Sequence, residues 1–139
     1  MSVVGNEATV AREEQRVTAL QVLQEADGYW GNSYSREEKL QWLSHLDGQI
    51  HEEILRKHLP LPGDFVPYKG VAALHRKLLV PEPYGRQLYL LWLESRMAYF
   101  HGETEHYNNA LEQFRSAYTA FARWYHGNHE LPRSARKFW

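Results

Sequence analysis

The spacing of large apolar residues near the end of the chain predicts a long amphipathic helix. Between positions 107 and 125 such residues recur every three or four positions: Tyr107, Leu111, Phe114, Tyr118, Phe121 and Tyr125. This spacing places all of them on a single stripe of an α-helix. We expect the stripe to pack against another helix and to form part of the core.

The preceding segment, residues 84–100, is apolar on nearly all sides. A helix without a polar face is buried on several sides, and a domain of this size has few other elements to cover it. We therefore expect another protein chain to cover part of this helix. The candidate oligomer interface is its second, outward stripe with a neighbouring cation: Tyr89, Trp92, Arg96 and Tyr99.

The four residues His101-Gly102-Glu103-Thr104 predict a tight corner between these two helices. The glycine suits the left-handed position after a helix, and the threonine suits the cap of the next helix. A short connection makes the two helices antiparallel. Residues 84–125 thus predict a helical hairpin on which the rest of the chain is built.

Two earlier segments also have helical patterns. Residues 8–26 predict a first helix that ends at Asp27-Gly28, and Ser35 with Glu38 matches a capping box that starts a second helix reaching about residue 57. Gly48 lies in the second helix, where glycine usually reflects the close approach of another backbone. Its neighbour Asp47 is interpreted as a hydrogen-bonded structural carboxylate.

Between the second helix and the hairpin, the chain has a different pattern. Three prolines and a glycine in residues 60–67 exclude regular helix and central strand, residues 71–75 suit a short helical turn, and residues 78–80 suit a short extended run or small hairpin. The predicted fold class is therefore all-α: an antiparallel bundle of about four helices with a short extended or hairpin excursion between helices 2 and 3. We expect one domain over residues 1–127 and an extended tail over residues 128–139.

Composition narrows the classes of function. The chain has 139 residues, no cysteine and a formal net charge of −1. The absence of cysteine excludes a disulfide framework and a thiolate metal site, and the charge argues against a surface dominated by nucleic-acid phosphates. No signal peptide or membrane-spanning run is evident, so we expect a soluble, intracellular protein.

The sequence gives little indication of catalysis. The densest group of possible metal ligands is His101, Glu103, Glu105 and His106, but the two histidines are five positions apart across a helix break. Helical metal pairs are three or four apart, so a loop site at this corner remains only an alternative. No phosphate-binding loop or nucleophile motif occurs. We expect no enzyme activity, no cofactor and no metal.

The last residues are the best candidates for binding another protein. They combine three cations with two bulky aromatic side chains: Arg133, Arg136, Lys137, Phe138 and Trp139. Such aromatic residues are costly to leave in water, yet the predicted helical core is complete before them. Docking on a partner is the functional interpretation, and packing on the same domain or having no fixed position are the alternatives.

An ordered set of short segments resembles a known family. The segments are Trp42-Leu43, Leu46-Asp47-Gly48-Gln49-Ile50, Glu53-Ile54, Leu79-Val80-Pro81, Pro83-Tyr84, His101-Gly102-Glu103, Tyr107-Asn108-Asn109, Phe121-Ala122 and Trp124-Tyr125. In this order and with similar gaps, over residues 38–125, they resemble the head-tail connector, or adaptor, proteins of tailed bacteriophages. Such families also include tail-completion proteins of similar size, so the resemblance does not fix the position in the phage neck.

The resemblance implies a structural virion protein. It implies a helical subunit of a ring, commonly of twelve copies, that binds the portal protein and the tail or neck proteins at the head-tail junction. DNA would pass through the channel without sequence-specific binding, and the subunit would be in the host cytoplasm during assembly. The competing class is a helical module that binds one protein or peptide as a monomer or small oligomer.

Overall fold

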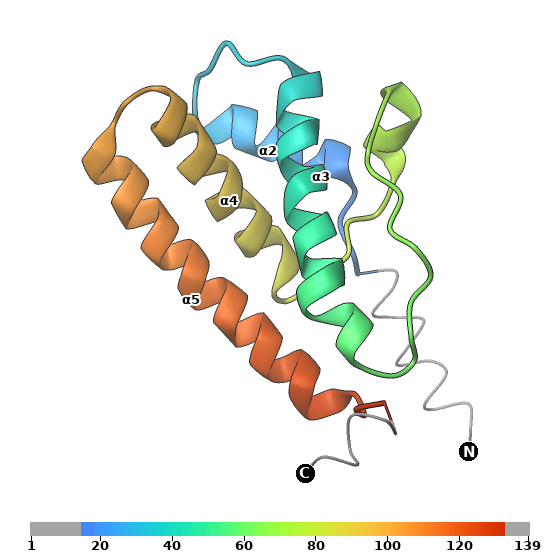
Figure 1. Ribbon diagram of the computed structural model, residues 1–139. Coiled ribbons are helices and arrows are strands. Elements are labelled where there is room, and N and C mark those ends of the chain that lie inside the picture. The colour runs from blue at the N-terminus through green and yellow to red at the C-terminus, as the bar shows by residue number, and fades with distance from the viewer. Residues whose placement is uncertain (1–14, 133–139) are drawn as a thin grey trace.

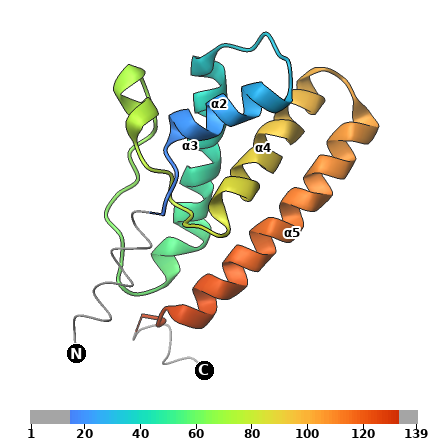
Figure 2. The same cartoon turned by 180° about the vertical axis from the view of Figure 1, so that it is seen from behind.

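The computed structural model describes residues 15–132 as a bundle of four α-helices with two short 3₁₀-helices. The α-helices are α2 (Ala19–Tyr29), α3 (Arg36–Glu53), α4 (Gly85–Phe100) and α5 (Thr104–Asn128), and the 3₁₀-helices are η1 (Leu55–Lys57) and η2 (Val71–His75). In Figure 1, α3, α4 and α5 lie side by side, and α2 crosses behind α3 and α4, as the reverse view in Figure 2 also shows. The predicted all-α bundle is confirmed.

The helical hairpin is formed by α4 and α5, which are antiparallel neighbours along their lengths. Gly102 turns the corner with a φ of 74°, the left-handed conformation that glycine adopts without steric cost. Thr104 is the first residue of α5 and not its cap, and the helix ends at Asn128, one residue after the predicted stop at Gly127. The periodic stripe is internal, since Phe114, Phe121 and Tyr125 are buried.

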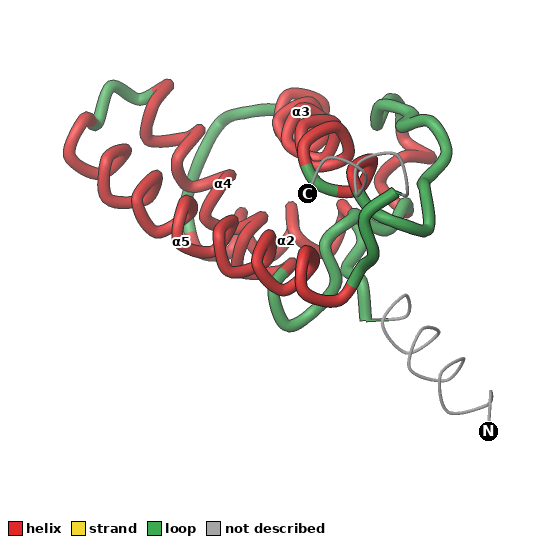
Figure 3. The backbone as a smooth tube through the Cα atoms, turned by 60° about the horizontal axis from the view of Figure 1, so that its bottom comes forward, coloured by secondary structure: helices red, strands yellow, loops and turns green. Residues whose placement is uncertain are grey.

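The helix α4 is covered on several sides within this chain. It contacts α2 and α3 as well as α5, and the tilted view of Figure 3 shows these four helices together. Its first residue, Gly85, lies so close to the backbone that a Cβ atom would come within 2.2 Å of the Val80 carbonyl oxygen. Most of the apolar surface of α4 is therefore buried without a second protein chain. The apolar character of this helix is thus no longer a reason to expect a partner.

The first helix is shorter at its start and longer at its end than predicted. Residues 15–18 are not helical, because the Val17 carbonyl accepts from Leu78 N at 2.8 Å and Thr18 forms an antiparallel bridge with Lys77. Thr18 then caps α2 in a capping box with Gln21. The helix continues through Asp27-Gly28 to Tyr29, and the earlier part of the predicted helix, residues 8–14, lies outside the described residues.

The second helix is close to the prediction. Ser35 Oγ accepts from Glu38 N, and α3 is followed directly by η1, which ends at Lys57. Gly48 does not interrupt the helix. The group that approaches it is the Phe65 ring, 3.4 Å from where a Cβ would lie, and not another backbone. Residues 60–67 form an irregular loop. Residues 76–78 pair with residues 17–19 at the start of α2 rather than with a hairpin partner of their own.

A buried carboxylate joins these elements. Asp47 of α3 has no exposed surface, and its oxygens accept from Tyr68 Oη at 2.5 Å, Tyr89 Oη at 2.6 Å and Leu79 N at 3.0 Å. Tyr89 Oη also accepts from Val80 N at 2.9 Å. Burial raises the pKa of Asp47, although the hydrogen bonds from both tyrosines and Leu79 oppose the rise. The predicted structural role of Asp47 is confirmed, with partners from three separate segments.

Replacing Asp47 with alanine should strongly destabilise the fold. Two phenol hydroxyls and one amide would lose their acceptor in a buried site, and each unpaired group costs about 1–3 kcal/mol. We expect the free energy of unfolding of Asp47→Ala, measured with urea, to fall by about 3 kcal/mol or more. The exposed Asp64→Ala is the matched control. Equal stability of the two variants would contradict this role of Asp47.

Candidate protein-binding site

The predicted binding residues lie in two places. The five residues of the basic aromatic segment, Arg133, Arg136, Lys137, Phe138 and Trp139, fall outside the described residues, so their binding role stays a prediction. The predicted tail starts at residue 128, but its first residues belong to the bundle, because α5 includes Asn128 and the Glu130 carbonyl accepts from Leu59 N at 2.6 Å.

The four residues predicted as an oligomer interface occupy different environments on α4. Tyr89 is completely buried at the Asp47 site, so the expectation that it faces outward is wrong. Trp92 is half-buried, its indole Nε1 donates to the Trp42 carbonyl of α3 at 2.9 Å, and its ring contacts Phe114 of α5. Tyr89 and Trp92 are covered because α3 and α5 pack against this part of α4.

The other two predicted interface residues are closer to the surface. The Arg96 guanidinium carbon lies 4.5 Å from the Trp92 ring centroid, 5.4 Å from that of Tyr99 and 5.6 Å from that of Tyr107. These distances are within the range of cation–π attraction, so Arg96 links the aromatic side chains of α4 and α5. Tyr99 is 56% exposed. Contact of Trp92, Arg96 and Tyr99 with a second subunit stays a prediction.

The structure places an aromatic cluster at this end of the bundle that was not predicted. Tyr34, Trp42, Phe100 and His101 come from the α2–α3 loop, α3 and the end of α4. The Trp42 and Phe100 rings are stacked at 5.5 Å, and Tyr34 is stacked on His101 at 5.3 Å. Phe100 nevertheless remains 54% exposed, next to the exposed Tyr99. Adjacent, partly exposed aromatic side chains are typical of the centres of protein interfaces.

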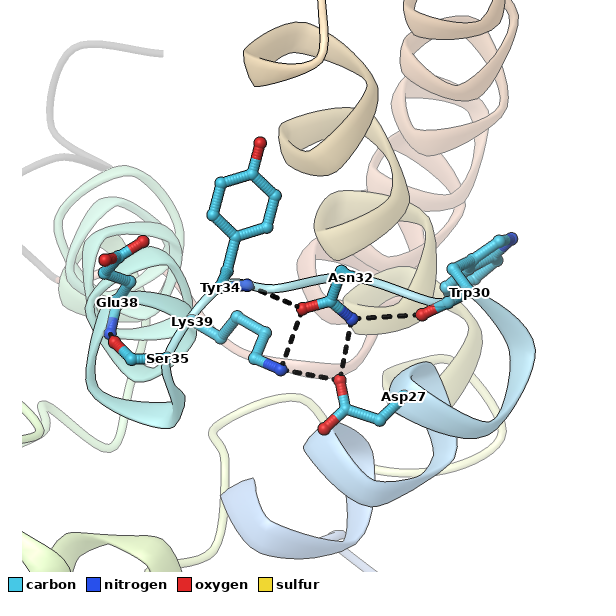
Figure 4. A network of polar contacts seen from close by, with 7 residues as sticks. All are labelled: Asp27, Trp30, Asn32, Tyr34, Ser35, Glu38 and Lys39. Carbon is cyan, nitrogen blue, oxygen red and sulfur yellow. Dashed lines mark hydrogen bonds and ion pairs between the residues drawn. The ribbon is translucent and has the colours of Figure 1, made fainter.

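A polar network holds Tyr34 in this cluster (Figure 4). Lys39 is only 3% exposed, and its ammonium group donates to Asp27 at 2.6 Å and to Asn32 Oδ1 at 3.1 Å. The Asn32 amide donates to Asp27 and to the Trp30 carbonyl, and Asn32 Oδ1 accepts from Tyr34 N. The network thereby fixes the loop between α2 and α3.

Charge within this network stabilises the folded state at neutral pH. Burial alone would raise the pKa of Asp27, but the hydrogen bonds from Lys39 and Asn32 and the charge of Lys39 lower it below its usual value. A buried lysine is rarely tolerated without such a partner. No sequence pattern indicated the network, since Asp27 was interpreted as the end of a helix.

The histidine at the hairpin corner is positioned by two carboxylates. His106 Nε2 lies 2.8 Å from Glu94 Oε2, and Nδ1 lies 2.9 Å from Glu103 Oε2. Both ring nitrogens can donate only when the imidazole is protonated, and the contacts with Glu94 and then Glu103 raise the pKa of His106. The arrangement ties the start of α5 to α4.

Within residues 15–132, no group of three or more histidine, aspartate or glutamate side chains has an arrangement that could hold a metal ion. Among the helices described, none is long and apolar enough to span a membrane.

Comparisons with known proteins give no relative. The chain matches no model of a known protein family, no curated protein and no solved structure.

Removing the buried charge of the Lys39 network should destabilise the fold. Lys39→Met keeps the length of the side chain but leaves Asp27 and Asn32 without their shared donor. Because Asp27 is partly exposed, water compensates some of the loss, and we expect the free energy of unfolding to fall by about 1–2 kcal/mol. The exposed Lys69→Met is the control. Losses of the same size in both variants would refute the role of Lys39.

The raised pKa of His106 should make its contribution to stability depend on pH. The contribution is complete below the unfolded pKa of 6.5 and is lost as pH rises through the higher folded pKa. We therefore expect His106→Gln to destabilise the chain more at about pH 6 than at about pH 8, as measured by urea unfolding.

A second histidine provides a control of opposite sign. Burial, then the charges of His58 and Lys57, lower the pKa of His126. Folding therefore favours the neutral form of His126. Its contribution to stability is complete above the unfolded pKa of 6.5 and is lost as pH falls through the lower folded pKa. His126→Gln should therefore be more destabilising at about pH 8 than at about pH 5.5. The same pH trend in both variants would rule out this assignment.

Proposed function

We propose that this chain is a structural, protein-binding subunit that forms the head-tail connector ring of a tailed bacteriophage, between the capsid portal and the tail. The observation that supports a binding role is the aromatic cluster of Tyr34, Trp42, Phe100 and His101 beside the exposed Tyr99. Rigid aromatic side chains provide large contact areas at a small cost in conformational entropy, which favours their use in protein interfaces.

The assignment to a connector rests on the resemblance described above. The segments that carry it contact one another in the fold: Asp47 accepts from Leu79, and Tyr84 packs against Phe121 and Trp124. Some of the segments that carry the resemblance therefore pack on one another in this fold. The connector family, the portal, the tail and the virion location come from the resemblance alone.

A ring subunit needs two different surfaces, one for each neighbour. We assign Trp92, Arg96 and Tyr99, with the aromatic cluster, to one contact surface. We assign the 133–139 segment to contacts with the portal or a neighbouring subunit, its cations pairing with acidic residues on the rim of the partner. DNA passes through the ring without sequence-specific contacts, and no catalytic step is part of this function.

A second candidate is a helical module that binds one protein as a monomer or small oligomer. The same aromatic cluster favours it, because a partner of any kind could cover Phe100 and Tyr99. A third candidate is that the chain is a tail-completion protein of the phage neck. These functions differ from the connector in the partner and in the number of copies.

The mass of the purified chain, measured by light scattering alone and after mixing with portal protein from the same source, tests the proposal. We expect a ring, or a monomer that becomes a ring on the portal. Phe100→Ser, which removes an exposed ring, should weaken this association about tenfold, whereas Ala120→Ser on the exposed side of α5 should not change it. A monomer indifferent to the portal would refute the connector assignment.

A further inference from the structure

A groove on the outer side of α4 combines apolar and acidic side chains. It runs between the end of α2 and α4, and its lining includes Tyr29, Trp30, Glu82, Leu90 and Glu94. Leu90 is half-buried, and Tyr29 stands at the rim with 61% of its surface exposed. A leucine beside two aromatic rings is a surface that another bulky apolar side chain can cover.

Charge in this groove is negative. The carboxylates of Glu82 and Glu94 line it together with the guanidinium of Arg86, and that guanidinium pairs with a third carboxylate, Glu25. One oxygen of Glu82 accepts from the backbone nitrogen of Arg86, and one oxygen of Glu94 binds His106. Three carboxylates thus face the Arg86 guanidinium and the His106 ring, so the groove suits a ligand that is both basic and apolar.

Two other grooves on the described surface have a different character. The groove along α3 has Trp42 and Phe65 but carries the basic side chains His45 and Lys69. The groove on the outer face of α5 contains two arginines with one glutamate and no large apolar residue. The groove beside α4 is thus the better match for a basic aromatic segment.

We propose that the groove between α2 and α4 binds residues 133–139 of a second copy of this chain. Phe138 and Trp139 cover Leu90 beside the rings of α2, and the three cations of the segment face the carboxylates of Glu82 and Glu94. The inference rests on the proposed function in one respect, that the subunit forms head-to-tail contacts. It identifies the surface that receives the segment, which the ring proposal leaves open.

The described end of the chain favours a second copy over the same copy. The Glu130 carbonyl accepts from the backbone nitrogen of Leu59, two residues after η1, which itself follows α3. Trp92 marks the side of α4 that faces α3, since it donates to Trp42. Leu90 and Glu94 are two positions from Trp92 on either side, which places them on the opposite side of the helix. The described chain therefore ends on the α3 side of the bundle, whereas Leu90 and Glu94 of the groove lie on the other side of α4.

Two full-length variants test the proposal by blocking one half of the contact each. The groove variant carries Gln87→Arg and Leu90→Arg, which place cations in the groove. The segment variant carries Phe138→Ser and Trp139→Ser. We expect each variant alone to self-associate at least tenfold more weakly than the native chain, as measured by sedimentation. Circular dichroism and thermal unfolding confirm that both variants fold.

The mixture of the two variants is the decisive measurement. The groove variant retains a native segment and the segment variant retains a native groove, so one contact can form between them and the mixture should give dimers but no larger species. The control variant carries Gln113→Arg and Ala120→Arg on the exposed face of α5, and it should associate as the native chain does.

Three results would overturn the proposal. The first is a groove variant that self-associates as strongly as the native chain. The second is a mixture of the two variants that forms no dimers, and the third is a native chain that stays monomeric at all concentrations. Repeating the association measurement with portal protein present distinguishes failure of this inference from failure of the proposed function. Association through the groove with no response to portal would refute the connector alone. Portal binding with native-like association of the groove variant would refute the groove alone.

Discussion

The fold depends on the burial of one carboxylate. Asp47 takes hydrogen bonds from a loop tyrosine, from the backbone of the segment before α4 and from Tyr89 within α4, so one side chain sets the relative positions of α3, α4 and the irregular chain between them. Desolvating this group is costly, and the cost is offset only when all three donors are in place. The long excursion between α3 and α4 therefore has a fixed course despite having no regular strand or α-helix.

The position of α4 determines which surfaces remain for partners. Because α2, α3 and α5 all contact it, the middle of this helix is internal, and its aromatic residues reach the surface only near its end. Two exposed aromatic rings, Tyr99 and Phe100, lie where α4 ends and where Tyr34 of the α2–α3 loop contacts Phe100. Binding surfaces on this bundle are thus formed where elements from distant parts of the chain meet.

The sequence predicts the parts of this structure that depend on local spacing. The apolar stripe of α5, the glycine at the corner and the serine at the start of α3 each act through neighbours within a few residues, and each is found as expected. Asp47 was recognised as structural, but its partners, 21 to 42 positions away, follow only from the tertiary arrangement. Tyr89 was placed on the wrong side of its helix, because periodicity cannot distinguish the buried from the exposed side of a helix that is apolar all round. The buried position of Lys39 was not predicted, because nothing local marks a lysine that pairs with a residue 12 positions away.

The hydrogen bond between Leu59 and Glu130 has a mechanical consequence. It holds the chain two residues after the end of α5. The neighbouring His129 stacks on Tyr125, with ring centroids 3.6 Å apart. Tension applied to the chain beyond Glu130 is transmitted to the end of α3 as well as along the axis of α5. The load is shared between two helices, so the bundle resists being unwound from its last turn. A subunit held by this end of the chain would be anchored through the body of the domain and not through a frayed helix.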